Sequence, residues 1–565
     1  MPNSSHVTRR ALVQQSSTAL VLPGLLFSAP DQRNPFMKIA GAPDSAIAFD
    51  ETGPIALKRA ASSWQGQDIE VRFVATGSQS AITVQAPKSV LRRVRLRWQI
   101  APPADLQYLG DQWERSYGDL SWRSMEPERI LPWYFIATNG KTTHACGVKT
   151  GPAAFCCWQV DPSGVSLWLD LRNGGRGVKL GDRELAVATV VTESYQGVTP
   201  FAATARFCRR MCEAPRLPAA PVYGGNNWYY AYGKSSADDI RQDSERIASF
   251  ASSTNNKPFM VIDDGWGPNR TAGPWSRGNT QFPDMAGLAR DMRRVGVQPG
   301  LWMRPLFTKE QIDPGWQLQS PNAQREYARE RAHTLDPTIP EALDMIRRDV
   351  RTPAGWGYQL IKHDFSTYDL LGRWGFAMGA QLTDENWNFA NRSRTNAEVI
   401  LDLYRAIRDA AGDVMLLGCN TVGHLAAGVF ELQRIGDDTS GRDWNRTRKM
   451  GVNTLAFRAP QHNTFFAVDA DCVGLTRQIP WELNRQWLDV LARSGTPLFV
   501  SAAPDAVESE QRDALRRAFK IASTPQPLGE PLDWLTNSEP ERWSFHGARA
   551  KYDWFGAEGA SPFAE

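Results

Sequence analysis

The stretch "GYQLIKHDFSTYDL", residues 357–370, begins as an apolar strand and ends in charged side chains. Lys362 and Asp364 lie two residues apart, so both side chains point to the same side of a strand. Burying a charge is costly unless it is paired, so these groups form either a structural ion pair or the lining of a pocket. The organisation of the rest of the chain favours the pocket.

Apolar runs like this one alternate with helical patterns from residue 221 onward, which is typical of a parallel α/β domain. Amphipathic helices are expected at 284–296, 397–412 and 508–522. Eight strand–helix units over roughly 300 residues predict a (β/α)8 TIM barrel, which we assign to residues 217–523. The sixth run leaves little room for a helix before it and is the weakest of the eight. The runs begin at Pro221, Pro258, Val297, Tyr358, Asp413, Phe430, Thr464 and Thr496.

The residues before the barrel have a different pattern. Short alternating runs such as "IEVRFVATG", residues 69–77, and "VSLWLDLRNGG", residues 165–175, predict an antiparallel β-sandwich over residues 35–216. In residues 93–98, Arg alternates with apolar residues, which indicates a strand with one solvated face. "APRLPAAP", residues 214–221, is a plausible linker, and residues 524–565 predict a small C-terminal β segment. We therefore expect a multidomain protein.

The composition excludes several classes of protein. With 42% hydrophobic and 22% charged residues the chain is globular, and a net charge of +3 without a basic block gives no support for nucleic-acid binding. The seven Cys are odd in number and lack zinc spacing, so free buried thiols are expected and a disulfide scaffold is not. No membrane span is expected in the mature chain.

The N-terminus resembles an export signal. Arg9 and Arg10 precede a mildly apolar run that ends near Phe27, so residues 1–30 predict a twin-arginine-type signal segment. The run is too short for a transmembrane helix. A periplasmic or secreted protein is the resulting expectation, and the alternative is a tail with a chance arginine pair.

Barrel enzymes place their chemistry at the C-terminal ends of the strands. A lysine beside Asp364 lowers the pKa of that carboxyl and suits a nucleophile, whereas a second carboxyl that keeps its proton suits an acid. Two such carboxyls are what glycoside hydrolysis uses. The residues at the predicted strand ends are Asn226, Asn227, Trp228, Asp263, Asp264, Trp266, Trp302, Arg304, Lys362, Asp364, Cys419, Asn420, Arg434, Asp437, Asp438, Asp469 and Asp471.

Five motifs in barrel order, "VIDDGW", "GLWMRP", "IKHDF", "GCN" and "RIGDDTS", resemble the retaining α-galactosidase (melibiase-like) clan of glycoside hydrolases. "GGNNWYYAYG" and "DADC" fit the first and seventh strands of that clan, so the resemblance spans about Val222 to Ser501. The N-terminal β-sandwich resembles the bacterial-type branch. The resemblance implies a retaining, exo-acting α-glycosidase that hydrolyses terminal α-galactosyl residues of oligosaccharides or glycoconjugates, without cofactor or metal.

The resemblance also implies roles for single residues. Asp364 would be the nucleophile, and Asp437 the acid/base with Asp438 in reserve. The further candidates for substrate binding are Asp263, Asp264, Lys362, Trp228, Trp266, Trp302, Arg304, Cys419, Arg434 and Asp438. His363, Arg304 and the short C-terminal segment depart from the pattern of the clan, which leaves the identity of the sugar open.

Several alternatives remain open at this point. The same carboxyl pair would serve a glycosidase of different sugar specificity or a transglycosylase, and a barrel without catalysis would only bind glycans. A metal-dependent hydrolase is disfavoured because the chain has only seven His and no HxH pair. The loop "YGDLSW", residues 117–122, is interpreted as domain packing, with a reach into the pocket as the alternative. The sequence leaves the oligomeric state open.

Overall fold

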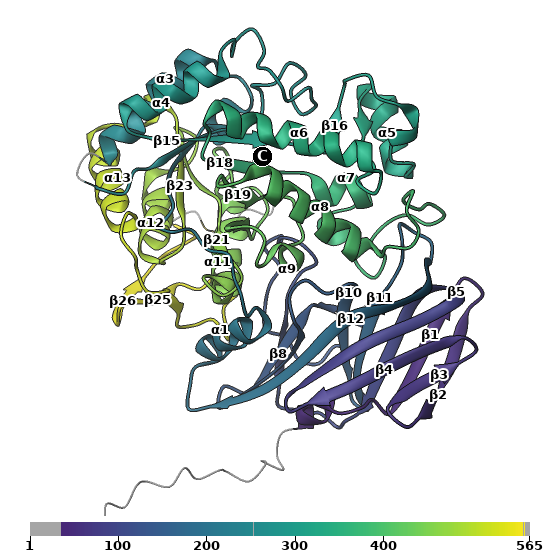
Figure 1. The fold of residues 1–565 in the computed structure, drawn as a ribbon. Coiled ribbons are helices and arrows are strands. Elements are labelled where there is room, and N and C mark those ends of the chain that lie inside the picture. The colour runs from purple at the N-terminus through teal and green to yellow at the C-terminus, as the bar shows by residue number, and fades with distance from the viewer. Residues whose placement is uncertain (1–34, 252–253, 557–558, 560–565) are drawn as a thin grey trace, which may run out of the picture. The chain divides into compact units, whose positions relative to one another are not determined.

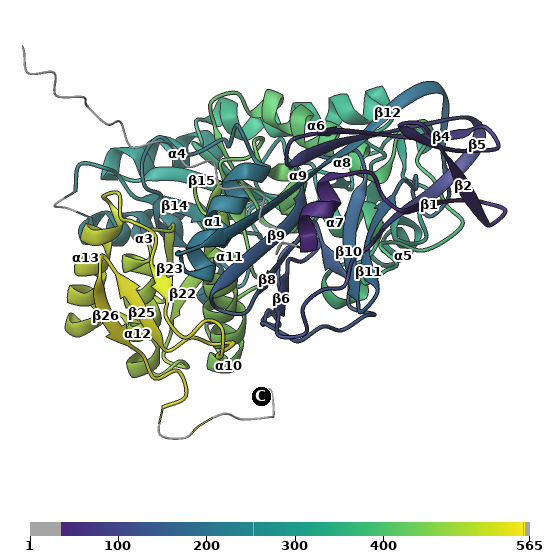
Figure 2. The ribbon, with the colours of Figure 1, turned by 90° about the horizontal axis from the view of Figure 1, so that it is seen from below.

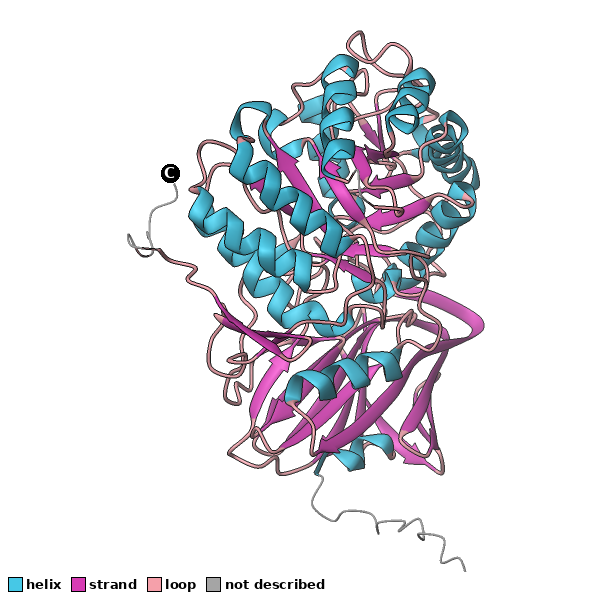
Figure 3. Ribbon diagram, turned by 90° about the vertical axis from the view of Figure 1, so that its left-hand side faces the viewer, coloured by secondary structure: helices cyan, strands magenta, loops and turns pink. Residues whose placement is uncertain are grey.

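The computed structural model describes residues 35–251, 254–556 and 559. The predicted signal segment, residues 1–30, lies outside the described residues. An antiparallel β domain comes first, strands that alternate with helices follow, and a small sheet comes last (Figures 1 and 3).

The N-terminal β domain forms one antiparallel sheet, which has twelve strands within the described residues. Strand β1 pairs with both β2 and β5, so the pairings β1-β2-β3-β4-β5 close into a ring. The sequence predicts two stacked sheets, but the long strands β5 and β12 join the pairings into one. The strands are β1 (Ser45–Asp50), β2 (Pro54–Ala60), β3 (Ser63–Gly66), β4 (Ile69–Thr76), β5 (Gln79–Gln99), β6 (Gln107–Gly110), β7 (Leu131–Pro132), β8 (Tyr134–Thr138), β9 (Thr142–Val148), β10 (Phe155–Asp161), β11 (Gly164–Asp170) and β12 (Val178–Gln196).

The alternation seen in the sequence sets the two faces of β5. Val94, Leu96 and Trp98 are fully buried, whereas the alternating Arg93 and Arg95 are partly exposed. The helix α1 (Pro200–Met211) follows, with Thr199 capping its N-terminus through the amide of Ala202 at 3.2 Å. Figure 2 shows α1 and the long strands of this domain from below.

A parallel sheet follows, with nine strands among the described residues, in the order β21-β20-β19-β18-β15-β14-β13-β23-β22. Only Ala470 and Asp471 separate β21 from β22, so one segment of chain pairs with β20 and then with β23. Counting that segment as one strand gives the order expected for an eight-stranded barrel, which stays our interpretation. The strands are β13 (Tyr223–Asn226), β14 (Phe259–Ile262), β15 (Gln298–Met303), β18 (Leu360–His363), β19 (Met415–Gly418), β20 (Leu432–Arg434), β21 (Ala467–Asp469), β22 (Cys472–Leu475) and β23 (Leu498–Ala502).

Helices connect these strands, and several begin at a side-chain cap. Thr395 and Glu398 form a capping box at the start of α8, with the Glu398 amide 3.1 Å from Thr395 Oγ1. Only the short α9 lies between β19 and β20, as the close spacing of the two runs predicts. The helices are α2 (Trp228–Ala231), α3 (Ala237–Phe250), α4 (Met285–Val295), α5 (Pro321–Glu330), α6 (Pro340–Trp356), α7 (Ser366–Leu371), α8 (Asn396–Ala411), α9 (Gly423–Ala426), α10 (Trp444–Thr447), α11 (Thr454–Arg458), α12 (Trp481–Arg493) and α13 (Ser509–Ala522).

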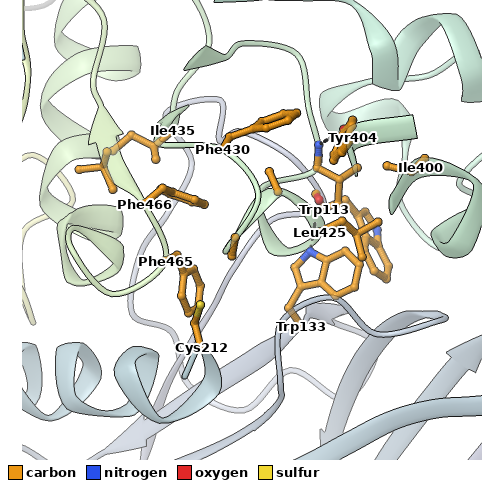
Figure 4. Close-up of a cluster of buried hydrophobic side chains, with 14 of the residues drawn as sticks. Trp113, Trp133, Cys212, Ile400, Tyr404, Leu425, Phe430, Ile435, Phe465 and Phe466 are labelled. Carbon is orange, nitrogen blue, oxygen red and sulfur yellow. Dashed lines mark hydrogen bonds between the residues drawn. The ribbon is translucent and has the colours of Figure 1, made fainter. Parts of the chain in front are cut away.

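The β domain and the parallel α/β region share one apolar core. Trp133 of the β domain stacks on His424 of α9, with ring centroids 4.8 Å apart. Figure 4 shows Trp113 and Trp133 beside Leu425, and Phe465 and Phe466 in the same cluster. The two regions are therefore packed as one body.

The chain ends in a small antiparallel sheet of β24 (Glu530–Pro531), β25 (Arg542–Phe545) and β26 (Ala548–Lys551). Trp543 and Trp554 are fully buried there. All seven Cys are free, and all except Cys157 are buried. Within the described residues, no helix combines the length and apolarity that crossing a bilayer requires.

Candidate active site

A cavity of about 320 Å³ opens at the C-terminal ends of the parallel strands. It brings together most of the residues that the sequence predicts for the site. The predicted residues that line it are Trp228, Asp263, Asp264, Trp302, Lys362, Asp364, Asp437 and Asp438. Tyr117 of the loop "YGDLSW" also lines it. The lining residues that the sequence did not single out are Arg115, Thr271, Phe365, Trp374 and Arg446.

Lys362 and Asp263 form the ion pair at the base of the cavity. Lys362 Nζ lies 2.7 Å from Asp263 Oδ2, and the same oxygen accepts a hydrogen bond from Asn226 Nδ2 at 2.7 Å. Both charged side chains are less than one tenth exposed. The sequence predicted that Lys362 would act on Asp364; the direct contact of Lys362 is with Asp263, and its charge also lowers the pKa of Asp364.

Asp264 provides an unsatisfied acceptor in the same wall. Its Oδ1 is buried and has no hydrogen-bond partner among the described residues. Burial, together with the negative charge of Asp263, raises the pKa of Asp264 to about 6. A buried oxygen without a partner is costly, and a hydroxyl group of a ligand would remove that cost.

Asp364 is buried and yet held in its ionised form. Burial acts to raise its pKa, but the charges of Lys362 and Arg115 and a hydrogen bond from Trp302 outweigh burial, and the pKa is lowered. Trp302 Nε1 donates to Asp364 Oδ2 at 2.9 Å, and the amides of Phe365 and Asn420 donate to Oδ1 at 2.7 and 3.0 Å. This carboxylate is fixed in orientation and suited to nucleophilic attack.

Asp437 and Asp438 face the cavity with different partners. Asp437 is held by two arginines, with Arg115 Nη2 at 3.0 Å and Arg446 Nη2 at 2.7 Å. Asp438 accepts from Arg434 Nη2 at 2.9 Å, and Arg115 Nη1 lies 4.0 Å away. Although burial opposes it, the positive charges of Arg434, Arg115 and Lys362 lower the pKa of Asp438. The side chain of Asp438 is 38% exposed and that of Asp437 only 16%.

Four residues predicted to bind substrate do not line the cavity. Trp266 is fully buried, donating to the carbonyl of Trp302 at 2.8 Å. Arg304 is paired with the buried Asp369, with Nε 3.0 Å from Oδ2, because a cation this deeply buried needs a carboxylate. Cys419 and Arg434 lie behind the wall, with Arg434 Nη1 3.8 Å from Cys419 Sγ. Arg434 therefore acts on the site through Asp438, and these residues support the lining.

His363 lies on the far side of the strand from Lys362 and Asp364, as strand alternation predicts. It is fully buried, with its ring edge-on to Tyr404 and Phe430 at 5.8 and 5.6 Å. Burial lowers its pKa to about 4, so the ring is neutral packing at neutral pH.

The β domain contributes to the cavity directly. Ser116 pairs with Gly436 in a β-bridge, which carries Arg115 and Tyr117 into the wall. The interpretation of "YGDLSW" as domain packing is therefore incomplete, since Tyr117 both packs and lines. Nothing in the local sequence marks Arg115, because its role depends on contacts with residues more than 300 positions away.

The described residues contain no cluster of side chains arranged to bind a metal ion. Within residues 35–251 and 254–556, no group of three or more His, Cys, Asp or Glu is placed to hold a metal ion. Three acidic residues of the cavity, Asp263, Asp437 and Asp438, are instead paired with lysine or arginine.

No protein-family model matches the sequence, and no curated protein matches it. Solved structures do match. An α-galactosidase from Thermus thermophilus, in complex with p-nitrophenyl α-D-galactopyranoside, is 16% identical and aligns with a TM-score of 0.57 over 90% of this chain and 99% of its own. The chain has the fold of this α-galactosidase.

Two further structures give the same result. A GH36 α-galactosidase from Geobacillus stearothermophilus, in complex with 1-deoxygalactonojirimycin, is 12% identical with a TM-score of 0.59, over 89% of this chain and 79% of its own. An α-galactosidase from Lactobacillus brevis is 11% identical with a TM-score of 0.54, over 85% of this chain and 72% of its own. At these identities the likeness establishes the fold.

Proposed function

We propose that this chain is a retaining α-glycosidase on a (β/α)8 barrel, acting on terminal α-galactosyl residues. The observation that carries the proposal is Asp364, a buried carboxylate whose pKa, despite burial, is lowered by Lys362, Arg115 and Trp302 and which faces other carboxyls across a cavity. The shared fold with α-galactosidases supports the sugar. The unpaired Oδ1 of Asp264 and the Asp263–Lys362 pair are suited to bind sugar hydroxyls.

In this proposal Asp364 attacks the anomeric carbon while a second carboxyl gives its proton to the departing glycosidic oxygen. The C–O bond to the leaving group breaks, and a covalent bond to Asp364 forms with inversion. The second carboxylate then removes a proton from water, which attacks the same carbon and releases Asp364. Two inversions retain the configuration.

The sequence ranked Asp437 before Asp438 as acid/base, and the contacts favour the opposite order. Two arginines hold Asp437, so protonation would break two charge-assisted bonds. Asp438 has one close arginine and a more exposed side chain, and its charge is near enough to act on Asp364. The charges of Arg434, Arg115 and Lys362 lower the pKa of Asp438 and so oppose the protonated form that an acid needs; the assignment rests on the contacts and the exposure. We therefore propose Asp438 as the acid/base and Asp437 as a group that holds Arg115 in place.

The test compares Asp364→Ala, Asp438→Asn and Asp437→Asn on aryl α-galactosides and on a substrate with a poor leaving group. Loss of the nucleophile should abolish turnover, with azide restoring part of the rate. An acid/base variant should lose about 10²–10⁴-fold on the poor leaving group and far less on an activated aryl group. If Asp437→Asn shows that leaving-group dependence and Asp438→Asn does not, our assignment is reversed. Full activity of Asp364→Ala would rule out the mechanism.

We also propose export through the twin-arginine-type segment, residues 1–30, to the periplasm or the medium. That route carries folded proteins, and the free thiols of this chain need no oxidation in order to fold. A reporter fused behind residues 1–30 should be exported, and replacing Arg9 and Arg10 by lysine should retain it in the cell.

A further inference from the structure

Two exposed aromatic rings lie at or next to the cavity: Trp374 lines it, and Phe376 packs on Tyr117, which also lines it. Trp374 is 37% and Phe376 72% exposed, and they flank Gly375 in a short 3-10 turn. Large exposed apolar side chains are few in the described residues, and these two occur within three positions of each other. Exposed apolar surface beside a polar cavity marks a binding surface.

The β domain holds this turn rigidly. The amide of Gly375 donates to Glu114 Oε1 at 3.0 Å, and Tyr117 Oη donates to the same oxygen at 2.5 Å. Trp113 Nε1 donates to the carbonyl of Gly379 at 2.8 Å. At Gly375, φ is +54° and a Cβ would lie 2.8 Å from the Tyr117 ring, so only glycine permits this approach.

Ring contacts fix the orientation of both aromatic side chains. The Trp374 ring packs on Tyr368 with centroids 4.7 Å apart, and Arg115 Cζ lies 5.9 Å from its centre. The Phe376 ring packs on Tyr117 at 5.7 Å. A platform that is ordered before binding loses little side-chain entropy when a ligand arrives.

The position of the rings indicates which part of a substrate they meet. The buried charges of Asp263, Lys362 and Asp364 form the inner wall, where the terminal sugar is cleaved in our proposed function. The remainder of the substrate has to leave through the open side, where the exposed rings lie. Pyranose rings present C–H faces that pack on aromatic rings.

We propose that Trp374 and Phe376 form a leaving-group platform that binds the sugars following the scissile bond. The substrate class is then an oligosaccharide of at least three sugars, preferred over galactosides of small alcohols. This inference rests on the proposed function, because it assumes cleavage at Asp364.

The test measures kcat/KM for stachyose and for methyl α-galactoside, and takes their ratio. In Trp374→Ala and in Phe376→Ala the ratio should fall about three- to tenfold, which is the loss of one aromatic stack. Leu532→Ala, an exposed apolar control, should keep the ratio within about twofold of the wild-type value. Calorimetry of stachyose binding to Asp364→Asn, with and without Phe376→Ala, should show the same loss of affinity.

The outcomes separate the two proposals. An unchanged ratio in both aromatic variants overturns the platform, even if Asp364→Ala is inactive. A second outcome is that the aromatic variants lose as large a factor in kcat/KM for p-nitrophenyl α-galactoside as for stachyose, each taken relative to methyl α-galactoside. That result would mean that the platform binds a single ring of the leaving group, which overturns the requirement for three sugars. If Asp364→Ala retains turnover of all these galactosides, the proposed function itself fails. Thermal unfolding of Phe376→Ala should match the wild type, because this ring is mostly exposed.

Discussion

Arg115, which the β domain supplies, acts on Asp364, Asp437 and Asp438 through its charge. Its guanidinium pairs with Asp437 and approaches Asp438. Burial acts to raise the pKa of Asp364, and Arg115 is second only to Lys362 among the charges that lower it. A residue of the β domain thereby helps to keep the proposed nucleophile of the parallel α/β region ionised.

Replacing Arg115 by Met should therefore raise the pKa of Asp364. The active form needs the ionised carboxylate, so the acidic limb of the kcat/KM profile should move to higher pH, with activity lost first at low pH. Arg115→Lys keeps a charge and should recover part of the shift. Arg446→Met removes the other arginine of Asp437 and is the matched control, for which we expect the limb to move less. A profile of Arg115→Met that superimposes on the wild type would contradict this role.

At the scale of single elements, several residues that the sequence pattern places at the strand ends line the cavity in the structure. Asp263 and Asp364 each follow a short strand, and Lys362 lies near the end of β18; because parallel strands end at one edge, all three line the cavity. Trp266 and Arg304 also occur in the motifs at the strand ends, but their side chains point into the interior. There Trp266 donates to the carbonyl of Trp302 and Arg304 to the carboxylate of Asp369. Motif position predicts that a residue is near the site, and the side-chain direction depends on packing partners that lie elsewhere in the chain.

The residues that sequence reasoning missed have the same explanation. Trp374 lies in the turn after helix α7, and this turn contacts Glu114 and Tyr117 of the β domain. Arg115 reaches the cavity through one β-bridge to Gly436. Neither position has a local period or spacing, so only the tertiary contacts reveal it.

The position of Asp438 depends on the two residues between β21 and β22, because one of them, Asp471, pairs with the arginine that holds Asp438. Asp471 has φ of +73° there and accepts hydrogen bonds from the amide and hydroxyl of Thr439 at 2.7 and 2.8 Å. Its Oδ2 also lies 2.5 Å from Arg434 Nη2, and Arg434 in turn holds Asp438. Asp471, whose role the sequence left undecided, is a positioning residue in this arrangement.

Asp471→Asn should keep the backbone conformation, since Asn tolerates positive φ, but it removes the charge that balances buried Arg434. We expect a loss of about 3–5 kcal/mol in the free energy of unfolding, measured with urea, and a lower kcat. Asp505→Asn is the control, because its arginine pair is exposed on both sides and should contribute little. Equal free energies of unfolding for Asp471→Asn and Asp505→Asn would show that Asp471 does not stabilise the protein through its pair with Arg434.

At the scale of the whole molecule, the β domain and the parallel α/β region are joined by a buried ion pair as well as by their shared core. Asp111 Oδ1 lies 3.0 Å from Arg458 Nε, and each side chain is only 3% exposed. Arg458 Nη1 also donates to the carbonyls of Glu114 and Ile435 at 2.7 and 3.0 Å. Arg458 thus connects the loop that carries Arg115 to the segment that follows β20 and carries Asp438.

Replacing Arg458 by Met should destabilise the protein more than any exposed contact between the two regions, because Asp111 stays buried without its partner. The expected cost is about 3–5 kcal/mol, measured by urea unfolding. Glu51→Gln breaks the more exposed pair between Glu51 and Arg392, 3.4 Å apart, and should cost at most about 1 kcal/mol. Because Arg458 also positions the loop of Arg115, the Arg458 variant should lose activity at denaturant concentrations where its secondary structure persists. Simultaneous loss of activity and secondary structure would instead indicate that the β domain and the parallel α/β region unfold as a single cooperative unit.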